Sequence, residues 1–368
     1  MAVYIHQLPN WPHFFWDEAL VNLPLPALRH QQGKLLGKME ALGFSLQNEA
    51  SLEIITLDVV KSGEIEGEIL DRDQVRSSIA RRLGMDIAGL IPADRNVEGI
   101  VEMMLDATQQ HEQPLTNERV FSWHNSLFPS GQSGMLKIVI GAWRNNAKNN
   151  PMQVVSGPGG RETLHFEAPE AEKLVMEMEL FFSWFNQNNN YDPIIKAAIA
   201  HLWFVTIHPL DDGNGRIARA ITDMQLARAD NSSHRFYSMS AQIRKERKTY
   251  YHLLESTQKD NLDITDWLLW FLACCDRSID ASNELLAVVL AKAKFWEINA
   301  KTLFNARQIL LINKLLDGFN GKLNSSKWAV IAKCSQDTAL RDIQDLMDKK
   351  VLRKENSGGR STAYELLC

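Results

Sequence analysis

The chain has 368 residues, of which 45% are hydrophobic and 23% are charged, a balance that excludes a disordered or fibrous protein. Its length suits two or three domains. The formal net charge of −5 excludes a general affinity for polyanions.

The sequence has no sign of a membrane-spanning or secreted protein. No apolar run approaches the roughly 20 residues needed to cross a bilayer. The first residues lack the basic and apolar segments of a signal peptide. The cysteines match neither a zinc nor a disulfide framework and are expected to be reduced thiols; they are Cys274, Cys275, Cys334 and Cys368. We therefore expect a cytoplasmic protein without a membrane partner.

Helices are predicted in the first part of the chain, where Leu28, Leu35 and Met39 recur at helical spacing. Further helices are expected over residues 68–82 and 97–108. The following stretch is rich in glycine and contains two short β-rich runs, 136–140 and 153–155, separated by a polar turn. These runs predict one β-hairpin with long loops.

The second half of the chain returns to helical patterns. The expected helices cover residues 170–186, 193–207, 216–228, 241–258 and 266–295. Three more helices follow at 306–316, 325–333 and 335–349, and two short strands at 351–354 and 362–366. This last order is typical of a winged helix-turn-helix. Residues 301–368 carry 12 Lys and Arg against 7 Asp and Glu, which supports a separate C-terminal module.

Residues 208–219 have the sequence His-Pro-Leu-Asp-Asp-Gly-Asn-Gly-Arg-Ile-Ala-Arg. Gly213, Asn214 and Gly215 stand directly before a helical run that begins at Arg216. A glycine-rich turn that opens a helix presents backbone N–H groups and the positive end of the helix dipole to one point. On its own, Gly-Asn-Gly would be an ordinary helix cap. Its neighbours make it a candidate anion site.

Those neighbours have the residue types that phosphate chemistry needs. Arg216 and Arg219 are three residues apart and lie on one helix face, where both can reach phosphate oxygens. Asp212 is a carboxylate beside the turn and suits Mg²⁺ that is shared with bound phosphates. His208, which Pro209 takes out of helical geometry, is a base at the rim of the loop. The segment therefore predicts phosphoryl or nucleotidyl transfer.

The segment resembles the signature of the Fic family, His-Pro-Phe-x-(Asp/Glu)-Gly-Asn-Gly-Arg-x-x-Arg. Leu210 stands where the family usually has Phe, and we expect it to pack the loop onto the core. The resemblance implies transfer of AMP from ATP to a hydroxyl of a target protein, with release of pyrophosphate. A related branch of kinases has Lys in place of the second glycine, so Gly215 favours AMP transfer over phosphorylation.

The resemblance also implies a role for each motif residue. His208 would deprotonate a Ser, Thr or Tyr of the target, and Asp212 would hold Mg²⁺. Arg216 would bind the β-phosphate of ATP and Arg219 the γ-phosphate. The residues that would surround the phosphates with backbone N–H groups are Gly213, Asn214 and Gly215.

A second segment, Ser-Gly-Glu-Ile-Glu-Gly at 62–67, is by itself an acidic helix end. Beside the first motif it resembles the Fic inhibitory motif, (Ser/Thr)-x-x-x-Glu-(Gly/Asn), of the class that carries this helix at its N-terminal side. Ser62 and Glu66 are four residues apart and share a helix face. The resemblance implies that Glu66 pairs with Arg219 and keeps ATP out of its productive pose. In some relatives the same Glu supports removal of AMP.

Two weaker features belong to the same resemblance. The expected hairpin, with Trp143, Met152 and Val154, is similar to the flap that docks a target segment by main-chain pairing. A plain structural hairpin is the alternative. Tyr251 and Gln258 are seven residues apart on the helix after the motif, and in relatives this region lies near the adenine. Core packing is the alternative for both.

The resemblance predicts a mainly α fold with four parts. They are a helical N-terminal extension (1–112) with the inhibitory segment 62–67, a Fic-type core with a hairpin flap (113–275), a connecting helix (276–302) and a winged helix-turn-helix (303–368). ATP, Mg²⁺ and an unidentified target protein are the expected partners. Family analogy also allows self-modification and a homodimer.

A different hypothesis starts from the C-terminal module, because a winged helix can bind DNA. Its third helix offers Gln336, Thr338 and Arg341 near the end that would contact bases. The basic side chains of its wing are Arg353, Lys354 and Arg360. The acidic side chains of the third helix would repel phosphates; they are Asp337, Asp342, Asp345 and Asp348. A DNA-binding regulator with a degenerate nucleotide site, a protein-docking module and an enzyme that removes AMP therefore stay open as alternatives.

Overall fold

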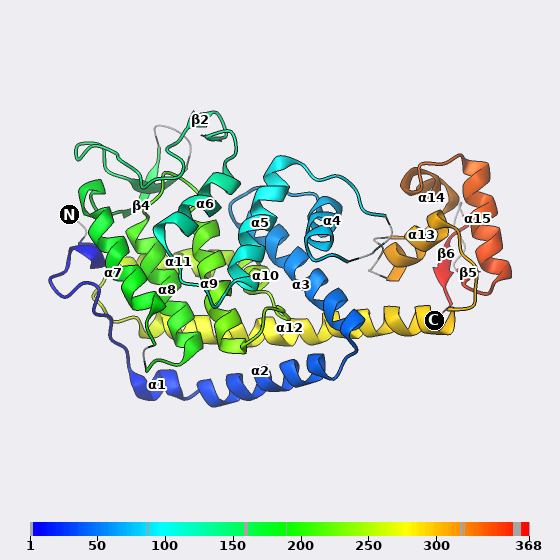
Figure 1. The fold of residues 1–368 in the computed structure, drawn as a ribbon, viewed down its shortest axis with the longest axis horizontal. Coiled ribbons are helices and arrows are strands. Elements are labelled where there is room, and N and C mark those ends of the chain that lie inside the picture. Colours follow the sequence, from blue (N-terminus) through cyan, green and yellow to red (C-terminus); the bar gives the residue numbers. More distant parts are fainter. Residues whose placement is uncertain are drawn as a thin grey trace. The chain divides into compact units, whose positions relative to one another are not determined.

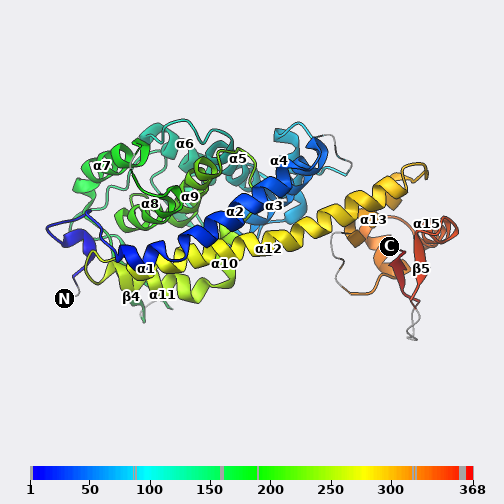
Figure 2. The ribbon, with the colours of Figure 1, turned by 90° about the horizontal axis from the view of Figure 1, so that it is seen from below.

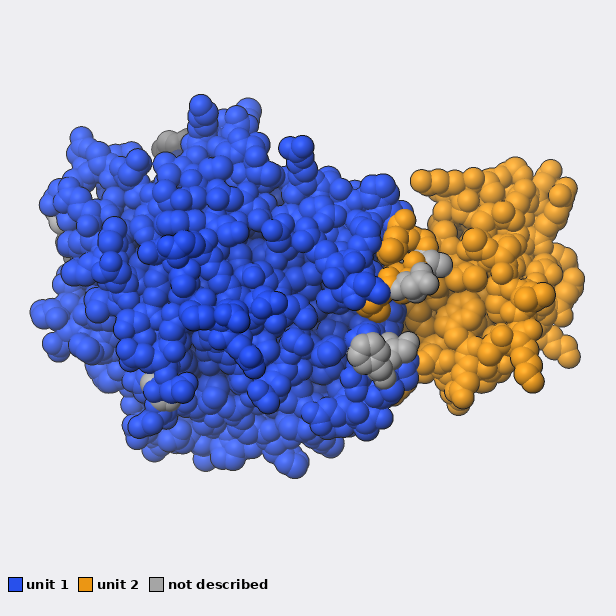
Figure 3. All heavy atoms as spheres, in the orientation of Figure 1, with its two compact units in different colours: residues 1–84, 91–282 blue, residues 85–90, 283–368 orange. Residues whose placement is uncertain are grey.

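The computed structural model describes residues 3–85, 87, 89–157, 161–188, 190–316, 319, 321–355 and 362–367. Two compact units make up the chain, and Figure 3 distinguishes them by colour. The first unit comprises residues 1–84 and 91–282, and the second comprises residues 85–90 and 283–368. Both consist mainly of helices, with a few short strands (Figure 1).

The first unit contains the residues expected to form the N-terminal extension and the catalytic core. Before the motif the helices are α1 (Glu18–Asn22), α2 (Leu25–Glu40), α3 (Phe44–Ile65), α4 (Arg72–Arg82), α5 (Arg95–Gln109), α6 (Asn117–Leu127), α7 (Leu174–Asn186) and α8 (Pro193–Ile207). After it come α9 (Asn214–Asp230), α10 (Met239–Lys245), α11 (Arg247–Gln258) and the start of α12 (Thr265–Ile298). Two single 3-10 turns, Ile5–Gln7 and Ala171–Lys173, complete the set of described helical elements in this unit.

Helix α8 lies at the centre of the first unit. It begins where Asp192 accepts a hydrogen bond from the Ile194 backbone N–H and Pro193 occupies the first turn. Every residue from Ile194 to Ile207 is buried. Helix α9 packs along it, and α5, α6 and α7 surround the pair (Figure 1). The motif loop joins the end of α8 to the start of α9, so it rests on the most buried part of the fold.

Among the described residues, the strands form three separate antiparallel pairs. In the first unit, β1 (Gln132–Ser133) pairs with β2 (Leu136–Lys137), and β3 (Gln153–Ser156) pairs with β4 (Thr163–Glu167). The prediction of one hairpin that joins 136–140 to 153–155 is therefore wrong. Gly134, at φ 56°, turns β2 back onto β1. The chain beyond β2 then bonds to the motif loop, because the Val139 N–H donates to Asp211 Oδ2 at 2.8 Å.

One predicted helix, 241–258, is two helices in the structure. The break falls at Glu246, between α10 and α11. The Glu246 carboxylate accepts hydrogen bonds from Trp270 Nε1 at 2.9 Å and Arg277 Nε at 2.7 Å, both on α12. These contacts with a distant helix, which local periodicity does not contain, fix the side chain at the break.

The second unit contains α13 (Ala306–Leu316), α14 (Ser325–Ile331) and α15 (Gln336–Asp348), followed by β5 (Leu352–Lys354) paired with β6 (Tyr364–Leu366). Its core centres on Trp328, Leu311 and Ile343. Three helices and a final antiparallel pair are the order that a winged helix-turn-helix requires. The predicted wing residues 356–361, Arg360 among them, lie outside the described residues.

The described residues include no helix that is both long and apolar enough to span a bilayer. The described cysteines are free thiols: Cys274 and Cys275 are buried and Cys334 is half-buried. Burial raises the pKa of the Cys275 thiol, which keeps it protonated. Cys368 lies outside the described residues.

Candidate active site

The motif loop begins with a backbone conformation that is rare for residues other than glycine. His208 ends α8 in the left-handed region, at φ 49° and ψ 56°, while its N–H still donates to the Phe204 carbonyl at 3.0 Å. Such residues cost conformational energy and concentrate where a fold holds them for a purpose. This turn carries the imidazole out of the helix.

Two residues inside the loop close it onto the core. Leu210 is fully buried, as expected for the residue that replaces the usual Phe. Asn214 is 2% exposed, and its side chain bonds both backbone groups of Leu210, accepting from the N–H at 3.0 Å and donating to the carbonyl at 2.8 Å. The Asn214 side chain therefore shapes the loop, and only its backbone is available to an anion.

Arg144 holds the loop from outside, a role that the sequence did not predict. Its Nε donates to the His208 carbonyl at 2.8 Å, and its backbone N–H donates to the Pro209 carbonyl at 3.0 Å. Its Nη2 reaches the Pro169 carbonyl at 2.6 Å. Arg144 is 2% exposed, and burial lowers its pKa to about 10, so it stays charged at neutral pH. We assign Arg144 as a positioning residue for His208.

The His208 imidazole is neutral in this structure. Burial lowers its pKa to about 4, and the positive charge of Arg144 works in the same direction. Its Nδ1 lies 3.2 Å from the Val205 carbonyl, which fixes the proton on Nδ1. The lone pair on Nε2 is then free to accept a proton.

The two aspartates of the loop face the β1–β2 turn. Asp212 accepts a hydrogen bond from the Ser133 hydroxyl, and its other oxygen accepts the Gly213 N–H at 2.6 Å. The Asp212 side chain is half-buried, so solvent and a metal ion can reach it. The described residues contain no group of three or more His, Cys, Asp or Glu side chains that would bind a metal by themselves. A metal at Asp212 would thus need ligand oxygens from a bound phosphate.

The two arginines of α9 make different contacts. Arg216 is 7% exposed, pairs with Glu68 at 2.8 Å and lies over the Phe128 ring, 4.8 Å from its centroid. Its buried Nε has no hydrogen-bond acceptor among the described residues. Arg216 is therefore held in place, and its Nε–H remains as a donor without an acceptor among the described residues.

Arg219 is bound by the inhibitory segment. Its Nη2 lies 2.8 Å from Glu66 Oε1 and donates to the Ser62 carbonyl at 3.1 Å, and its Nε donates to the Ser62 hydroxyl at 2.8 Å. Burial opposes the charge of Arg219, but the Glu66 carboxylate together with Tyr250 and Tyr251 raises the pKa above its ordinary value. Its buried Nη1 has no acceptor among the described residues. The structure thus brings Ser62, Glu66 and Arg219 together.

Glu66 also occupies the space above Gly215. A Cβ built on Gly215 would overlap Glu66 Oε1, so a larger residue there would displace this carboxylate. An anion already sits against the N-terminus of α9 and the second arginine. The Glu66 carboxylate thereby lies beside the first turn of α9, where a helix N-terminus favours negative charge.

The two residues expected near the adenine, Tyr251 and Gln258, have different surroundings in the structure. The Tyr251 hydroxyl lies 3.5 Å from Glu66 Oε2, and the Arg247 guanidinium lies over the Tyr251 ring. Gln258 is 5% exposed and donates to the Thr206 hydroxyl at 3.1 Å, inside the protein. Tyr251 therefore borders the motif, while the Gln258 amide is engaged in the core.

The three side chains expected on the flap pack against their own chain. The Trp143 ring lies 4.5 Å from the Phe121 ring, measured between centroids. Met152 and Val154 pack on a small cluster that includes Phe166. The exposed apolar side chains of this hairpin are Val155 and Leu164. The docking role predicted for Trp143, Met152 and Val154 stays a prediction.

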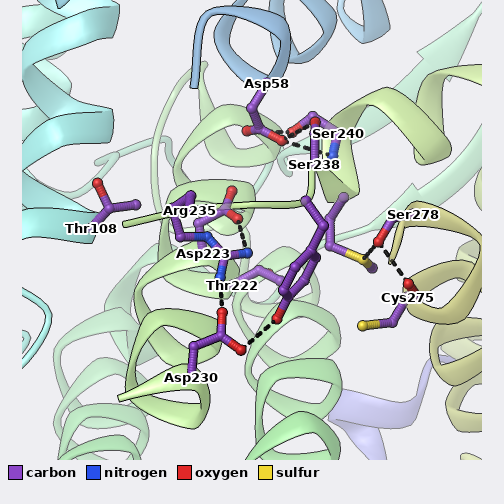
Figure 4. Close-up of polar contacts among 12 residues, drawn as sticks. Asp58, Thr108, Thr222, Asp223, Asp230, Arg235, Ser238, Ser240, Cys275 and Ser278 are labelled. Carbon is purple, nitrogen blue, oxygen red and sulfur yellow. Dashed lines mark hydrogen bonds and ion pairs between the residues drawn. The ribbon is translucent and has the colours of Figure 1, made fainter. Parts of the chain in front are cut away.

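A buried polar network attaches the inhibitory helix α3 to the core (Figure 4). Asp58, one helical turn before Ser62, accepts hydrogen bonds from the Ser238 hydroxyl and from both the N–H (3.1 Å) and the hydroxyl (2.9 Å) of Ser240. These serines begin α10. The carboxylate thus attaches α3 to the start of α10.

The same region contains a second buried carboxylate. Asp223, on α9 one turn after Arg219, pairs with Arg235 at 3.1 Å, and Arg235 also binds Asp230 at 2.5 Å (Figure 4). Burial and the nearby Asp58 raise the pKa of Asp223 well above its ordinary value. The proximity of Asp58 on α3 and Asp223 on α9 therefore favours the protonated form of Asp223.

Comparisons with known sequences agree with this geometry. Residues 114–226 match the model of the Fic/DOC family, and residues 4–85 match a domain of unknown function (DUF4172). A Drosophila grimshawi protein named "Protein adenylyltransferase Fic" is 26% identical over 227 residues, which cover 59% of this chain and 40% of that protein. One of the same name from Drosophila mojavensis is 32% identical over 114 residues, 30% of this chain and 21% of that protein. The chain thus spans less than half of these relatives.

Solved structures agree in fold. A Fic family protein from Desulfovibrio desulfuricans superposes with a TM-score of 0.52 at 18% identity, covering 97% of this chain and 98% of that one. A Fic-domain signalling protein from Bacteroides thetaiotaomicron gives the same score and identity over 72% of this chain and 97% of that one.

Proposed function

The chain is a Fic-domain protein, and we propose that it is a protein adenylyltransferase that Glu66 holds in an inhibited state. The reaction would move AMP from ATP to a Ser, Thr or Tyr hydroxyl of a target protein. The observation that carries this proposal is the Glu66–Arg219 pair at 2.8 Å, above Gly215. It supports an anion site that is complete and blocked from within the chain.

ATP fits the site as the substrate once Glu66 leaves. Arg219 would then lose its carboxylate partner and offer Nη1 and Nη2 to the γ-phosphate. The unpartnered Nε of Arg216 would face the β-phosphate. The backbone N–H groups at the start of α9 would complete the contacts.

The chemical step needs one base and one leaving group. His208 Nε2 would take the hydroxyl proton of the target as that oxygen attacks the α-phosphorus. A bond from the target oxygen to the α-phosphorus forms, and the bond from the α-phosphorus to the bridging oxygen breaks. Pyrophosphate departs with that oxygen. Arg144 would keep the imidazole aligned through the His208 carbonyl.

Asp212 is the residue that would hold Mg²⁺, since its carboxylate is half-buried and lies beside the anion turn. When bound, the ion would neutralise part of the phosphate charge. The Ser133 hydroxyl and the Gly213 N–H donate hydrogen bonds to the Asp212 carboxylate and orient it.

The proposal is tested with ATP labelled either at the α- or the γ-phosphate, using Glu66→Gly and Glu66→Gly/His208→Ala proteins. We expect the α-label alone to become protein-bound, and only with His208 present. Transfer of the γ-label alone would identify a kinase instead. A third outcome is that neither label is transferred, either to the protein itself or to proteins of a cell lysate. That result would favour the alternative reaction, in which the enzyme removes AMP from modified proteins and Glu66 takes part.

A further inference from the structure

A second candidate site lies at the other end of the two central helices. A cavity of about 440 Å³ is lined by Lys196 at the start of α8 and by Gln225 and Arg228 near the end of α9. The motif loop joins the opposite ends of these helices. Helix geometry separates Lys196 from His208 by ~18 Å. The cavity is therefore distinct from the motif.

Lys196 is an unusually buried cation at this cavity. It is 7% exposed, and burial together with the charge of Arg228 lowers its pKa to about 8. Its Nζ donates to the Gln187 carbonyl at 2.7 Å and lies 5.7 Å from the centroid of the Phe185 ring. An ammonium group has three hydrogens, so two are left for another acceptor.

Arg228 lies over the same Phe185 ring, 4.8 Å from its centroid. It donates to the backbone carbonyls of His111 at 2.6 Å and Gln113 at 3.0 Å. Among the residues that the structure describes, no carboxylate forms an ion pair with Lys196 or Arg228. The exposed Glu112 carboxylate also lines the cavity but forms no described ion pair with either cation. A buried lysine and a half-buried arginine that share one aromatic ring without an ion-paired carboxylate favour an anionic ligand.

Gln225 also lines the cavity and is 4% exposed. Its amide nitrogen donates to the Pro193 carbonyl at 3.5 Å, at the start of α8. The volume suits a small metabolite. We propose that the cavity binds a small organic anion, either a carboxylate or a phosphate monoester.

Calorimetry with malate and with glycerol 3-phosphate tests the site, and sodium chloride at equal ionic strength serves as the blank. We expect one saturable site in the wild-type protein for at least one probe, and the preferred probe identifies the anionic group. Lys196→Met keeps the apolar stem and removes the charge, and should weaken binding about tenfold or more. Lys34→Met makes the same change at an exposed lysine of α2 and should leave binding unchanged.

The two variants also distinguish binding in this cavity from binding at the motif. The affinity of a probe that binds at the motif would not change in Lys196→Met. Equal binding to wild type and Lys196→Met, or no binding of either probe, would overturn the proposal. Should Lys196→Met fail to fold, a crystal of the wild-type protein with the tighter probe decides. Density between Lys196 and Arg228 would support the site, and its absence there would refute it.

Discussion

Glu66 Oε1 lies 2.8 Å from Arg219 Nη2, and the Arg219 side chain is 1% exposed. This pair joins the C-terminal end of α3 to the second turn of α9. The arginine is needed for the γ-phosphate in the proposed reaction, so its pairing within the chain opposes the reaction. Arg219 is buried, whereas the Glu66 side chain is 32% exposed, so removal of Glu66 leaves a buried arginine without its counter-charge.

The overlap at Gly215 predicts a measurable coupling. Gly215→Ala should lower the free energy of unfolding by about 1–3 kcal/mol, because its methyl group meets the Glu66 carboxylate. Glu66→Gly combined with Gly215→Ala should recover most of that loss. Denaturant melts of the four proteins in this cycle measure the coupling. Additive losses would mean that Glu66 does not lie above Gly215 in solution.

Ser62 should support the inhibitory pair rather than replace it. Ser62→Ala removes the hydroxyl that accepts from Arg219 Nε at 2.8 Å, yet the Glu66 pair remains. We expect labelling from α-labelled ATP to rise about two- to tenfold, in line with a net contribution of about 0.5–1.5 kcal/mol from one hydrogen bond. Ser51→Ala is the control, since Ser51 is an equally buried serine of α3. Unchanged labelling in Ser62→Ala would argue against a role for the hydroxyl.

Arg144 should affect turnover more than nucleotide binding. In the Glu66→Gly protein, Arg144→Met should lower kcat about tenfold or more and leave the KM for ATP near its starting value, because the loop around His208 loses its support. Arg95→Met, at an exposed arginine at the start of α5, provides the control. A rise in KM without a fall in kcat would place Arg144 in nucleotide binding instead.

Asp223 should make stability depend on pH. Its pKa is raised in the folded state, so the folded protein holds this proton more tightly than the unfolded chain does. The stabilisation is complete below the ordinary Asp value of about 4 and is lost as the pH rises toward the raised pKa. Asp223→Asn lacks this loss. Its stability relative to wild type should therefore increase from pH 4 upward.

Urea melts at several pH values measure that difference, with Asp266→Asn, at an exposed aspartate, as the control. A constant difference between Asp223→Asn and wild type across this range would show that Asp223 is already charged in the folded state.

The sequence predicts elements well where the deciding contacts are local. Pro193 and Ile207, the bounds expected for the central helix, are the bounds of α8. Leu210 is buried as expected, because the residues around it in the motif set the loop. The Glu66–Arg219 contact follows from the resemblance to a known motif pair, since 153 positions separate the two residues and no local pattern joins them.

Where distant contacts decide, the sequence says less. Strand β3, at Gln153–Ser156, pairs with the following strand at Thr163–Glu167. The run at 136–140 instead pairs with the preceding strand at Gln132–Ser133. Arg144 Nε and Nη2 donate to the backbone carbonyls of His208 and Pro169. Every residue has a backbone carbonyl, so the sequence does not show which ones an arginine will bind. Gln258 lies on the expected helix, but its side-chain amide donates a hydrogen bond to the buried Thr206 hydroxyl. This contact with a distant helix determines where the amide points.

The most direct test of the account is the rate of AMP incorporation from α-labelled ATP in wild type, Glu66→Gln and Glu64→Gln. Glu64 is the matched control, since it pairs with Lys61 and Arg244 and not with the motif. We expect Glu66→Gln to label at least about tenfold faster than wild type, and Glu64→Gln to label like wild type. Equal rates in wild type and Glu66→Gln would contradict inhibition by Glu66.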